Sequence, residues 1–95
     1  MDSYFKFEPN KNINNFFILR EINRGSYGSV LETINLKNDH KYALKVIRNE
    51  ERFRQQCIHE INILKFLNQN NTNNKYPIIK FYGFFEFEKH YCLIF

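Results

Sequence analysis

The spacing of hydrophobic and polar positions changes along the chain, and this change predicts the order of its elements. Alternating apolar and aromatic residues mark strands, whereas spacings of three and four mark an amphipathic helix. The predicted order is three strands, one helix and two further strands. The strands are expected at residues 16–22, 30–36, 42–47, 78–87 and 91–95, and the helix at residues 49–68.

The strand expected at residues 42–47 presents different side chains to its two faces. Its alternation puts Ala43, Lys45 and Ile47 on one face and Leu44 and Val46 on the other. Lys45 is therefore expected to project from a strand beside a small alanine. Taken alone, this lysine is more simply explained as a solvated strand residue, since lysine is rarely buried unless it is paired.

The predicted helix carries an apolar stripe and an acidic residue at the margin of that stripe. The stripe consists of Phe53, Cys57, Ile61, Leu64 and Leu67, a pattern typical of a helix that packs on a sheet. Asn49 is expected to cap the helix. An ammonium group that faces the covered side of a sheet needs a counter-charge. Glu60, just before Ile61 of the stripe, is therefore the expected partner of Lys45.

Two segments of the chain lack a regular pattern. Residues 1–15 are polar and are interrupted by Pro9 and four asparagines, so we expect an N-terminal arm or an extra, loosely attached hairpin. Residues 68–74 are expected to form a loop. The domain itself is expected to span residues 16–95, and its last two strands to form a hairpin that turns at residues 88–90.

The size and composition of the chain narrow the classes of protein to which it can belong. Its 95 residues, 43% of them hydrophobic, suffice for one domain with a modest core, which excludes a two-domain enzyme. The net charge of +4 is scattered along the chain and argues only weakly for nucleic acid as a partner. Cys57 and Cys92 are the only cysteines, which disfavours a metal site and indicates an intracellular setting. We expect no membrane span and find no targeting signal.

Two glycines lie between the first two predicted strands, in the sequence Ile-Asn-Arg-Gly-Ser-Tyr-Gly-Ser-Val at residues 22–30. Glycines at this spacing let backbone amides approach phosphate oxygens, and Val30 offers an apolar surface to a flat ring. Most turns of this kind between strands are plain hairpins, so the motif alone is weak. The lysine strand and the helical Glu60 strengthen it.

These features together resemble the N-terminal lobe of protein kinases of the CMGC group, over residues 16–95. In that family, a glycine loop is followed by a strand that carries a Val-Ala-Ile-Lys-like sequence, here Tyr-Ala-Leu-Lys at residues 42–45. A helical glutamate and two further strands come next. Residues 44–49, 60–64 and 90–95 are similar to the cdc2-like (LAMMER) and DYRK dual-specificity kinases. The resemblance implies an α+β fold, in which a five-stranded antiparallel sheet packs against one helix.

The resemblance also implies a site for ATP with Mg²⁺. The residues that it assigns to ATP binding are Ile22, Asn23, Arg24, Gly25, Ser26, Tyr27, Gly28, Val30, Ala43, Lys45 and Phe95. Ile22, Val30, Ala43 and Phe95 would wall the adenine site. Lys45 would hold the α- and β-phosphate oxygens, and Glu60 would orient Lys45. Asn23 stands where the family's loop has its first glycine, and asparagine tolerates unusual backbone angles better than most residues.

The resemblance implies that the full-length parent is a serine/threonine or dual-specificity kinase, which transfers the γ-phosphate of ATP to protein hydroxyl groups. Phe95 corresponds to the gatekeeper before the hinge, and the catalytic and metal-binding residues of the family lie beyond that hinge. Asp2 and Asp39, the only aspartates here, lie in the arm and in a turn. We therefore assign no catalytic or metal-binding residue, and we expect a lobe truncated at the hinge that is inactive alone. Protein substrates would bind through the other lobe. The resemblance also implies that the protein is located in the nucleus or cytoplasm.

Two other functions remain open. A non-catalytic interaction module, or a pseudokinase remnant, would bind partners through the exposed face between the lobes. An RNA-binding domain is suggested by Lys-Phe-Tyr-Gly-Phe-Phe-Glu-Phe at residues 80–87, which imitates an RNP1 strand. However, Phe81 replaces the glycine of that motif, and residues 25–36 do not predict the helix that such a fold needs there. RNA binding is therefore the weaker alternative.

Overall fold

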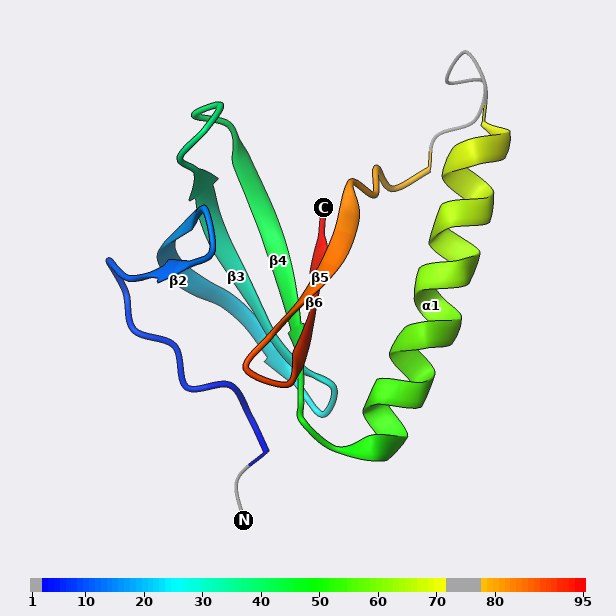
Figure 1. Ribbon diagram of the computed structural model, residues 1–95, viewed down its shortest axis with the longest axis horizontal. Coiled ribbons are helices and arrows are strands. Elements are labelled where there is room, and N and C mark those ends of the chain that lie inside the picture. Colours follow the sequence, from blue (N-terminus) through cyan, green and yellow to red (C-terminus); the bar gives the residue numbers. More distant parts are fainter. Residues whose placement is uncertain (1–2, 72–77) are drawn as a thin grey trace.

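The computed structural model describes residues 3–71 and 78–95, which form one antiparallel sheet and one helix. The strands are β1 (Asn12–Ile13), β2 (Phe16–Gly25), β3 (Gly28–Asn35), β4 (Lys41–Ile47), β5 (Gly83–Phe87) and β6 (His90–Ile94), and the helix is α1 (Glu51–Asn70). The strands lie in the order β1-β2-β3-β4-β6-β5. Figure 1 shows α1 on one side of the sheet and the N-terminal arm (residues 3–15) on the other.

The predicted α+β architecture is confirmed, but the sheet has six strands rather than five. The additional strand, β1, belongs to the N-terminal arm and pairs with β2. The prediction of a strand at residues 78–87 is wrong for the first half of this range, since β5 begins only at Gly83. In that first half, the backbone amide of Phe81 donates to the Asn68 side chain of α1 at 3.2 Å. This stretch is thus held by the helix as well as by the sheet.

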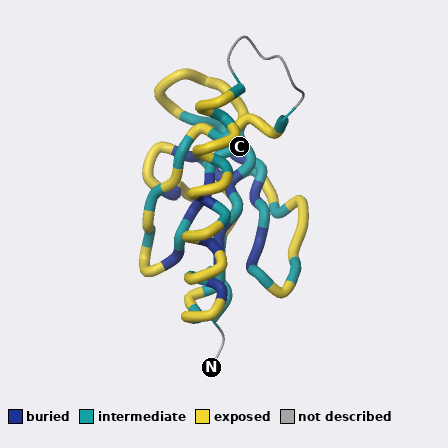
Figure 2. The backbone as a smooth tube through the Cα atoms, turned by 90° about the vertical axis from the view of Figure 1, so that its right-hand side faces the viewer, coloured by how far each residue is buried: buried dark blue, intermediate teal, exposed yellow. Residues whose placement is uncertain are grey.

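The sheet carries a hydrophobic core on each side. The core on the side of the arm consists of Ile13, Phe16, Ile18, Leu31, Leu44, Val46 and Cys92. The core under α1 consists of Ile47, Phe53, Cys57, Ile61 and Leu93. Leu44 and Val46 therefore face away from Ile47, as the alternation along β4 predicts. Figure 2 shows that the buried stretches lie mainly in the strands, whereas much of α1 is exposed.

The N-terminal arm is packed, which its polar composition does not predict. Phe5 and Phe7 pack against the core on their side of the sheet, and Ile13 is only 1% exposed. Two turns bring the arm into place through Asn10 and Asn14, which have φ of 66° and 52°. Asparagine adopts this left-handed conformation more readily than most residues. The arm is therefore part of the core rather than loosely attached.

Helix α1 covers the sheet with only part of its length. Of the predicted stripe, Phe53, Cys57 and Ile61 are buried and Leu64 is half-buried. Leu67 is 43% exposed, so the prediction that it belongs to the packed stripe is wrong. The early turns of α1 therefore provide most of the packing.

The ends of α1 differ from the prediction. Glu50 occupies the N-cap position without a side-chain capping bond, so the expectation that Asn49 caps the helix is wrong. The Glu50 carboxylate instead lies 2.7 Å from Nε of Arg52. The helix continues to Asn70, two residues further than expected. The loop predicted at residues 68–74 is thus helical in its first part, and most of the rest lies outside the described residues.

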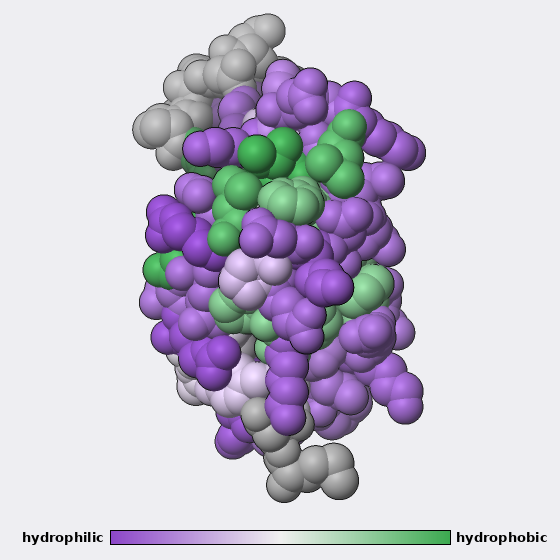
Figure 3. Space-filling model, turned by 90° about the vertical axis from the view of Figure 1, so that its left-hand side faces the viewer, coloured by the Kyte–Doolittle hydropathy of each residue, from purple (hydrophilic) through white to green (hydrophobic). Residues whose placement is uncertain are grey.

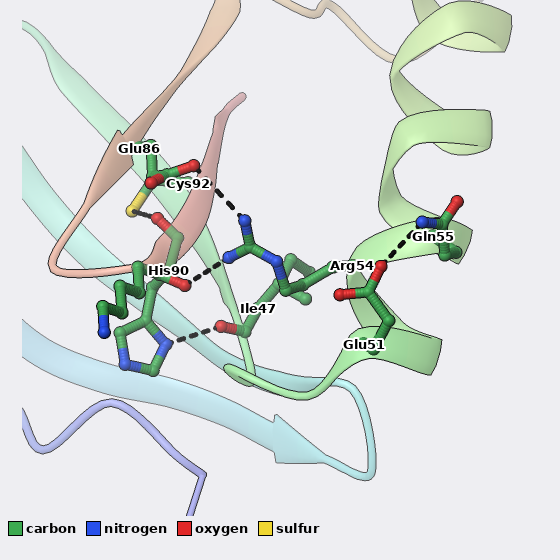
Figure 4. Close-up of polar contacts among 8 residues, drawn as sticks. Ile47, Glu51, Arg54, Gln55, Glu86, His90 and Cys92 are labelled. Carbon is green, nitrogen blue, oxygen red and sulfur yellow. Dashed lines mark hydrogen bonds and ion pairs between the residues drawn. The ribbon is translucent and has the colours of Figure 1, made fainter.

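A two-residue turn joins β5 and β6. Glu88 and Lys89 have φ of 50° and 68°, and two consecutive left-handed residues are typical of a type I′ hairpin turn. His90, expected to belong to this turn, is instead buried in β6. Its Nδ1 lies 2.7 Å from the carbonyl oxygen of Ile47, at the end of β4 (Figure 4). This contact fixes the turn to the strand that precedes α1.

Hydrophilic side chains cover much of the surface. Figure 3 shows the side on which β2 lies, where one group of hydrophobic side chains stands out in the upper part. On α1, Ile63 and Phe66 are 57% and 63% exposed. Within the described ranges, no helix combines the length and the apolar character needed to cross a membrane.

Candidate functional site

One face of the sheet collects several residues that the sequence singles out. Directly opposed residues of antiparallel strands lie on the same face, and the register opposes Lys45 to both Val30 and Leu93. Leu93 belongs to the core under α1, so all three residues lie on the helix side. Ala43, two residues earlier in β4, exchanges two backbone hydrogen bonds of 2.9 Å with Phe95. Ala43 and Phe95 therefore share this face.

Lys45 and Glu60 form an ion pair on this face. The Nζ of Lys45 lies 2.9 Å from Oε1 and 3.1 Å from Oε2 of Glu60, and the two side chains are 23% and 36% exposed. The buried Ile61 next to Glu60 holds this part of α1 against the sheet. A pair with this much solvent contact contributes about 0–1 kcal/mol to stability. Stability alone is therefore a weak reason for the pair.

The turn between β2 and β3, which we call the glycine turn, spans Gly25 to Gly28. These two glycines oppose each other, with Ser26 and Tyr27 between them. Gly28 has φ of +146°, and a Cβ added there would collide with the carbonyl oxygen of Val46. Residues with a side chain rarely adopt this conformation. The geometry of the turn alone thus requires a glycine at this position.

Tyr27, at the tip of the glycine turn, folds toward Lys45. The centre of its ring lies 4.9 Å from Nζ of Lys45, within the range of a cation–π contact. The ring also packs against the core under α1. A Cβ added at Gly25 would lie 2.6 Å from the ring. The glycine turn, the tyrosine ring and the Lys45–Glu60 pair therefore meet at one place.

The other residues expected to bind nucleotide before and within the turn are exposed: Ile22, Asn23, Arg24 and Ser26. The Oδ1 of Asn23 accepts a hydrogen bond of 2.9 Å from the amide of Arg24. Asn23 is not among the described residues with positive φ, so its backbone conformation does not require the glycine that the kinase loop has at this position. Arg24 forms an ion pair with Glu21.

A shallow hollow of about 180 Å³ lies beside Ala43, and its lining consists of Ile22, Glu32, Lys41, Tyr42 and Ala43. The lining thus includes two of the four residues expected to wall the adenine site. The other two, Val30 and Phe95, are half-buried on the face that carries Lys45.

The groups on this face fit a nucleoside triphosphate. An ammonium group matches phosphate oxygens, glycine amides can approach them closely, and small apolar side chains suit a flat ring. For Mg²⁺ the described residues contain no cluster of three or more histidine, cysteine, aspartate or glutamate side chains. We therefore assign no ligand of the metal within the described ranges.

Arg54 of α1 contacts the β5–β6 turn, and the sequence analysis did not predict this contact. Figure 4 shows Arg54 reaching from α1 toward Glu86, and its Nη1 donates to the carbonyl oxygen of Lys89. The guanidinium also lies 4.4 Å from the ring centre of Tyr91. These contacts connect the early part of α1 to the β5–β6 hairpin. Their partners lie far away in the sequence, and no local pattern indicates them.

Both cysteines are buried and have raised pKa values. Burial, with a smaller contribution from the Glu60 carboxylate, raises the pKa of the Cys57 thiol to about 11. Burial raises the pKa of Cys92 to about 12. Because the thiolate is the reactive form of cysteine, neither residue is suited to nucleophilic chemistry at neutral pH.

Comparison with known proteins agrees with this geometry. Residues 16–95 match the family model for the protein kinase domain. The chain therefore belongs to the protein kinase family. Because it does so, the RNA-recognition fold is not the fold of this chain.

Two curated relatives illustrate the match. The chain is 38% identical over 78 residues to human dual specificity tyrosine-phosphorylation-regulated kinase 4, an alignment that covers 82% of this chain and 15% of that protein. It is 36% identical over 78 residues to the dual specificity tyrosine-phosphorylation-regulated kinase mbk-2 of Caenorhabditis elegans, with 82% and 10% covered. The resemblance to DYRK kinases is confirmed, whereas the resemblance to LAMMER kinases stays a prediction.

A solved structure supports the same assignment. The crystal structure of a kinase domain matches with a TM-score of 0.87 and 32% sequence identity, over 97% of this chain and 27% of that one. The chain thus spans only a small part of the relatives that it matches.

Proposed function

We propose that the chain is the ATP-binding lobe of a serine/threonine or dual-specificity protein kinase. The observation that carries this proposal is the Lys45–Glu60 ion pair, which lies next to the glycine turn and on the same face as Val30 and Ala43. Both curated relatives described above are dual-specificity kinases. The whole protein would transfer the γ-phosphate of ATP to hydroxyl groups of protein substrates.

Each group on this face has a role that its chemistry suits. ATP, bound with Mg²⁺, supplies the phosphoryl group that is transferred. The ammonium of Lys45 would hold phosphate oxygens, and Glu60 would keep that ammonium in place. The amides of the glycine turn would donate to the phosphates, and Val30 and Ala43 would cover the adenine together with Ile22 and Phe95.

The remaining roles belong to the whole protein. Because the chain spans 15% of the human relative, we assign the proton-accepting and metal-binding residues to a second lobe. Protein substrates would also bind to this second lobe. The whole protein would act in the nucleus or cytoplasm. The lobe alone would bind nucleotide weakly, since half of the adenine cleft would be contributed by its partner lobe.

An NMR titration of the isotopically labelled chain with millimolar MgATP tests the proposal. We expect the amide signals of Gly25, Gly28 and Val30 to shift, and Lys45→Met to reduce these shifts. The matched control is Lys37→Met, which removes the same charge from an exposed position in the β3–β4 turn. This control should respond to MgATP as the unchanged chain does.

Two results would count against the proposal. One is the lack of any MgATP-dependent shift at the glycine turn of the unchanged chain. The other is an equal loss of the shifts in the Lys45→Met and Lys37→Met chains, which would indicate attraction by overall charge.

A further inference from the structure

The N-terminal arm lies outside residues 16–95, which match the kinase family, yet its first described residues contact the glycine turn. The hydroxyl of Tyr4 donates to the carbonyl oxygen of Gly25 at 2.8 Å. The Oγ of Ser3 accepts a hydrogen bond of 2.8 Å from Nε of Arg48. The arm therefore contacts both the turn and the residue that follows β4.

Arg48 extends this contact along the turn. Its side chain is 20% exposed, and its Nη1 donates to the carbonyl oxygen of Ser26 at 3.1 Å. Its backbone amide donates to the carbonyl oxygen of Tyr27 at 2.8 Å. Tyr4 and Arg48 together thus bind three consecutive carbonyl groups, those of Gly25, Ser26 and Tyr27.

The ring of Tyr4 makes a second, independent contact with the turn. The guanidinium groups of Arg24 and Arg48 lie 5.0 Å and 4.5 Å from the centre of the ring, within cation–π range. Arg24 directly precedes Gly25. Tyr4 therefore holds the turn through a hydroxyl hydrogen bond at one residue and through a ring contact at the residue before it.

These contacts suit a turn that binds an anion. Phosphate oxygens are hydrogen-bond acceptors, so such a turn must offer amide groups and direct its carbonyl oxygens elsewhere. Donors from Tyr4 and Arg48 engage the three carbonyl groups. A turn that is already held in one conformation also loses less conformational freedom when a ligand binds.

We propose that Ser3 and Tyr4, together with Arg48, position the glycine turn for phosphate binding. The role in phosphate binding rests on the function proposed above. The positioning of the turn rests on contacts within the free chain and can be tested without nucleotide. Ser3 and Tyr4 are thus positioning residues of the site.

Limited trypsin digestion of the folded chain tests the positioning directly, because trypsin cleaves after Arg24 only when the turn opens. Tyr4→Phe keeps the ring and removes the hydroxyl. We expect cleavage after Arg24 to become about fivefold faster, the effect of one lost hydrogen bond on a local opening equilibrium. Cleavage after Lys45, in the middle of β4, reports global unfolding, so the ratio of the two rates isolates the turn.

Tyr42→Phe is the matched control. It also removes a tyrosine hydroxyl, one that accepts a hydrogen bond of 3.0 Å from Asn38 near the β3–β4 turn. The ratio of cleavage rates should be unchanged in this control. Ser3→Ala is the second variant and decides the matter if Tyr4→Phe unfolds the chain. It should raise the same ratio.

The outcomes are distinct. An unchanged ratio in both arm variants, or an equal rise in Tyr42→Phe, overturns the positioning. A raised ratio together with an MgATP response about fivefold weaker in Tyr4→Phe supports the whole inference. A raised ratio in a chain whose unchanged form ignores MgATP supports the positioning and refutes the proposed nucleotide site.

Discussion

Replacing Ile13 by alanine tests whether the N-terminal arm belongs to the core. Ile13 is 1% exposed and packs in the cluster that includes Phe16, Ile18 and Leu44. The change removes three carbon atoms, and at about 0.8 kcal/mol for each buried CH₂ the transfer loss is about 2.4 kcal/mol. The remaining cavity brings the expected loss to about 3–4 kcal/mol. Domains are typically stable by about 5–15 kcal/mol, so the loss would be large.

Urea unfolding followed by circular dichroism measures this loss. Ile63→Ala is the matched control, because it makes the same change at a position that is 57% exposed on α1. The control should change stability by less than about 0.5 kcal/mol. In a thermal melt, Ile13→Ala should lower the midpoint by roughly 12–32 °C, at about 4–8 °C per kcal/mol.

Two results would refute the reasoning. A loss for Ile13→Ala no larger than that for Ile63→Ala would mean that β1 does not contribute to the core. A smaller urea dependence of the unfolding free energy in the Ile13→Ala chain would mean that its arm is already detached in the folded state.

Three further predictions concern the turns, the helix and the thiols. Gly28→Ala should destabilise the chain by at least about 1 kcal/mol more than Gly83→Ala in urea unfolding, since both residues have positive φ but only Gly28 would collide with backbone; equal losses would contradict this. Arg54→Met should loosen α1, so hydrogen exchange in its first turns should quicken, whereas Arg52→Met, at a more exposed position, should not have this effect. The folded pKa values of Cys57 and Cys92 are raised, so the stability they contribute is present below the ordinary thiol pKa of 9.0 and is lost as the pH rises toward about 11–12. Urea midpoints at about pH 8 and 10 should therefore fall less in Cys92→Ala than in the unchanged chain, and equal falls would contradict this.

Much of the fold could be predicted from the sequence because its signals are local. Alternation in β4 separates the face of Lys45 from that of Leu44, and the three- and four-residue spacing of α1 brings Glu60 to the sheet. The change of period between these two elements indicates where the strand ends and the helix begins. The ion pair follows from these two patterns and from the need of an ammonium group for a counter-charge.

Other features depend on contacts that no local pattern reveals. The apolar residues of the arm, such as Phe5 and Ile13, are separated by polar ones, so their common burial appears only once the asparagine turns fold the arm back. The hydrogen bond from Tyr4 to Gly25 joins residues that are 21 positions apart. Before β5 begins, the amide of Phe81 donates to the side chain of Asn68, which lies 13 positions earlier in the sequence.

The strand order has a consequence for how the sheet meets other chains. The two outermost strands are β1 and β5, and unpaired backbone groups at such edges can recruit strands from a neighbouring molecule. At one edge, β1 is only two residues long and pairs with Phe16 and Phe17, and the charged side chains of Arg20, Glu21 and Arg24 disfavour pairing along the rest of β2. At the other, β5 has five residues with Phe84 42% exposed, and only the charge of Glu86 interrupts its aromatic run. Self-association by strand addition would therefore start at β5, which makes this edge the one to protect when the protein is concentrated.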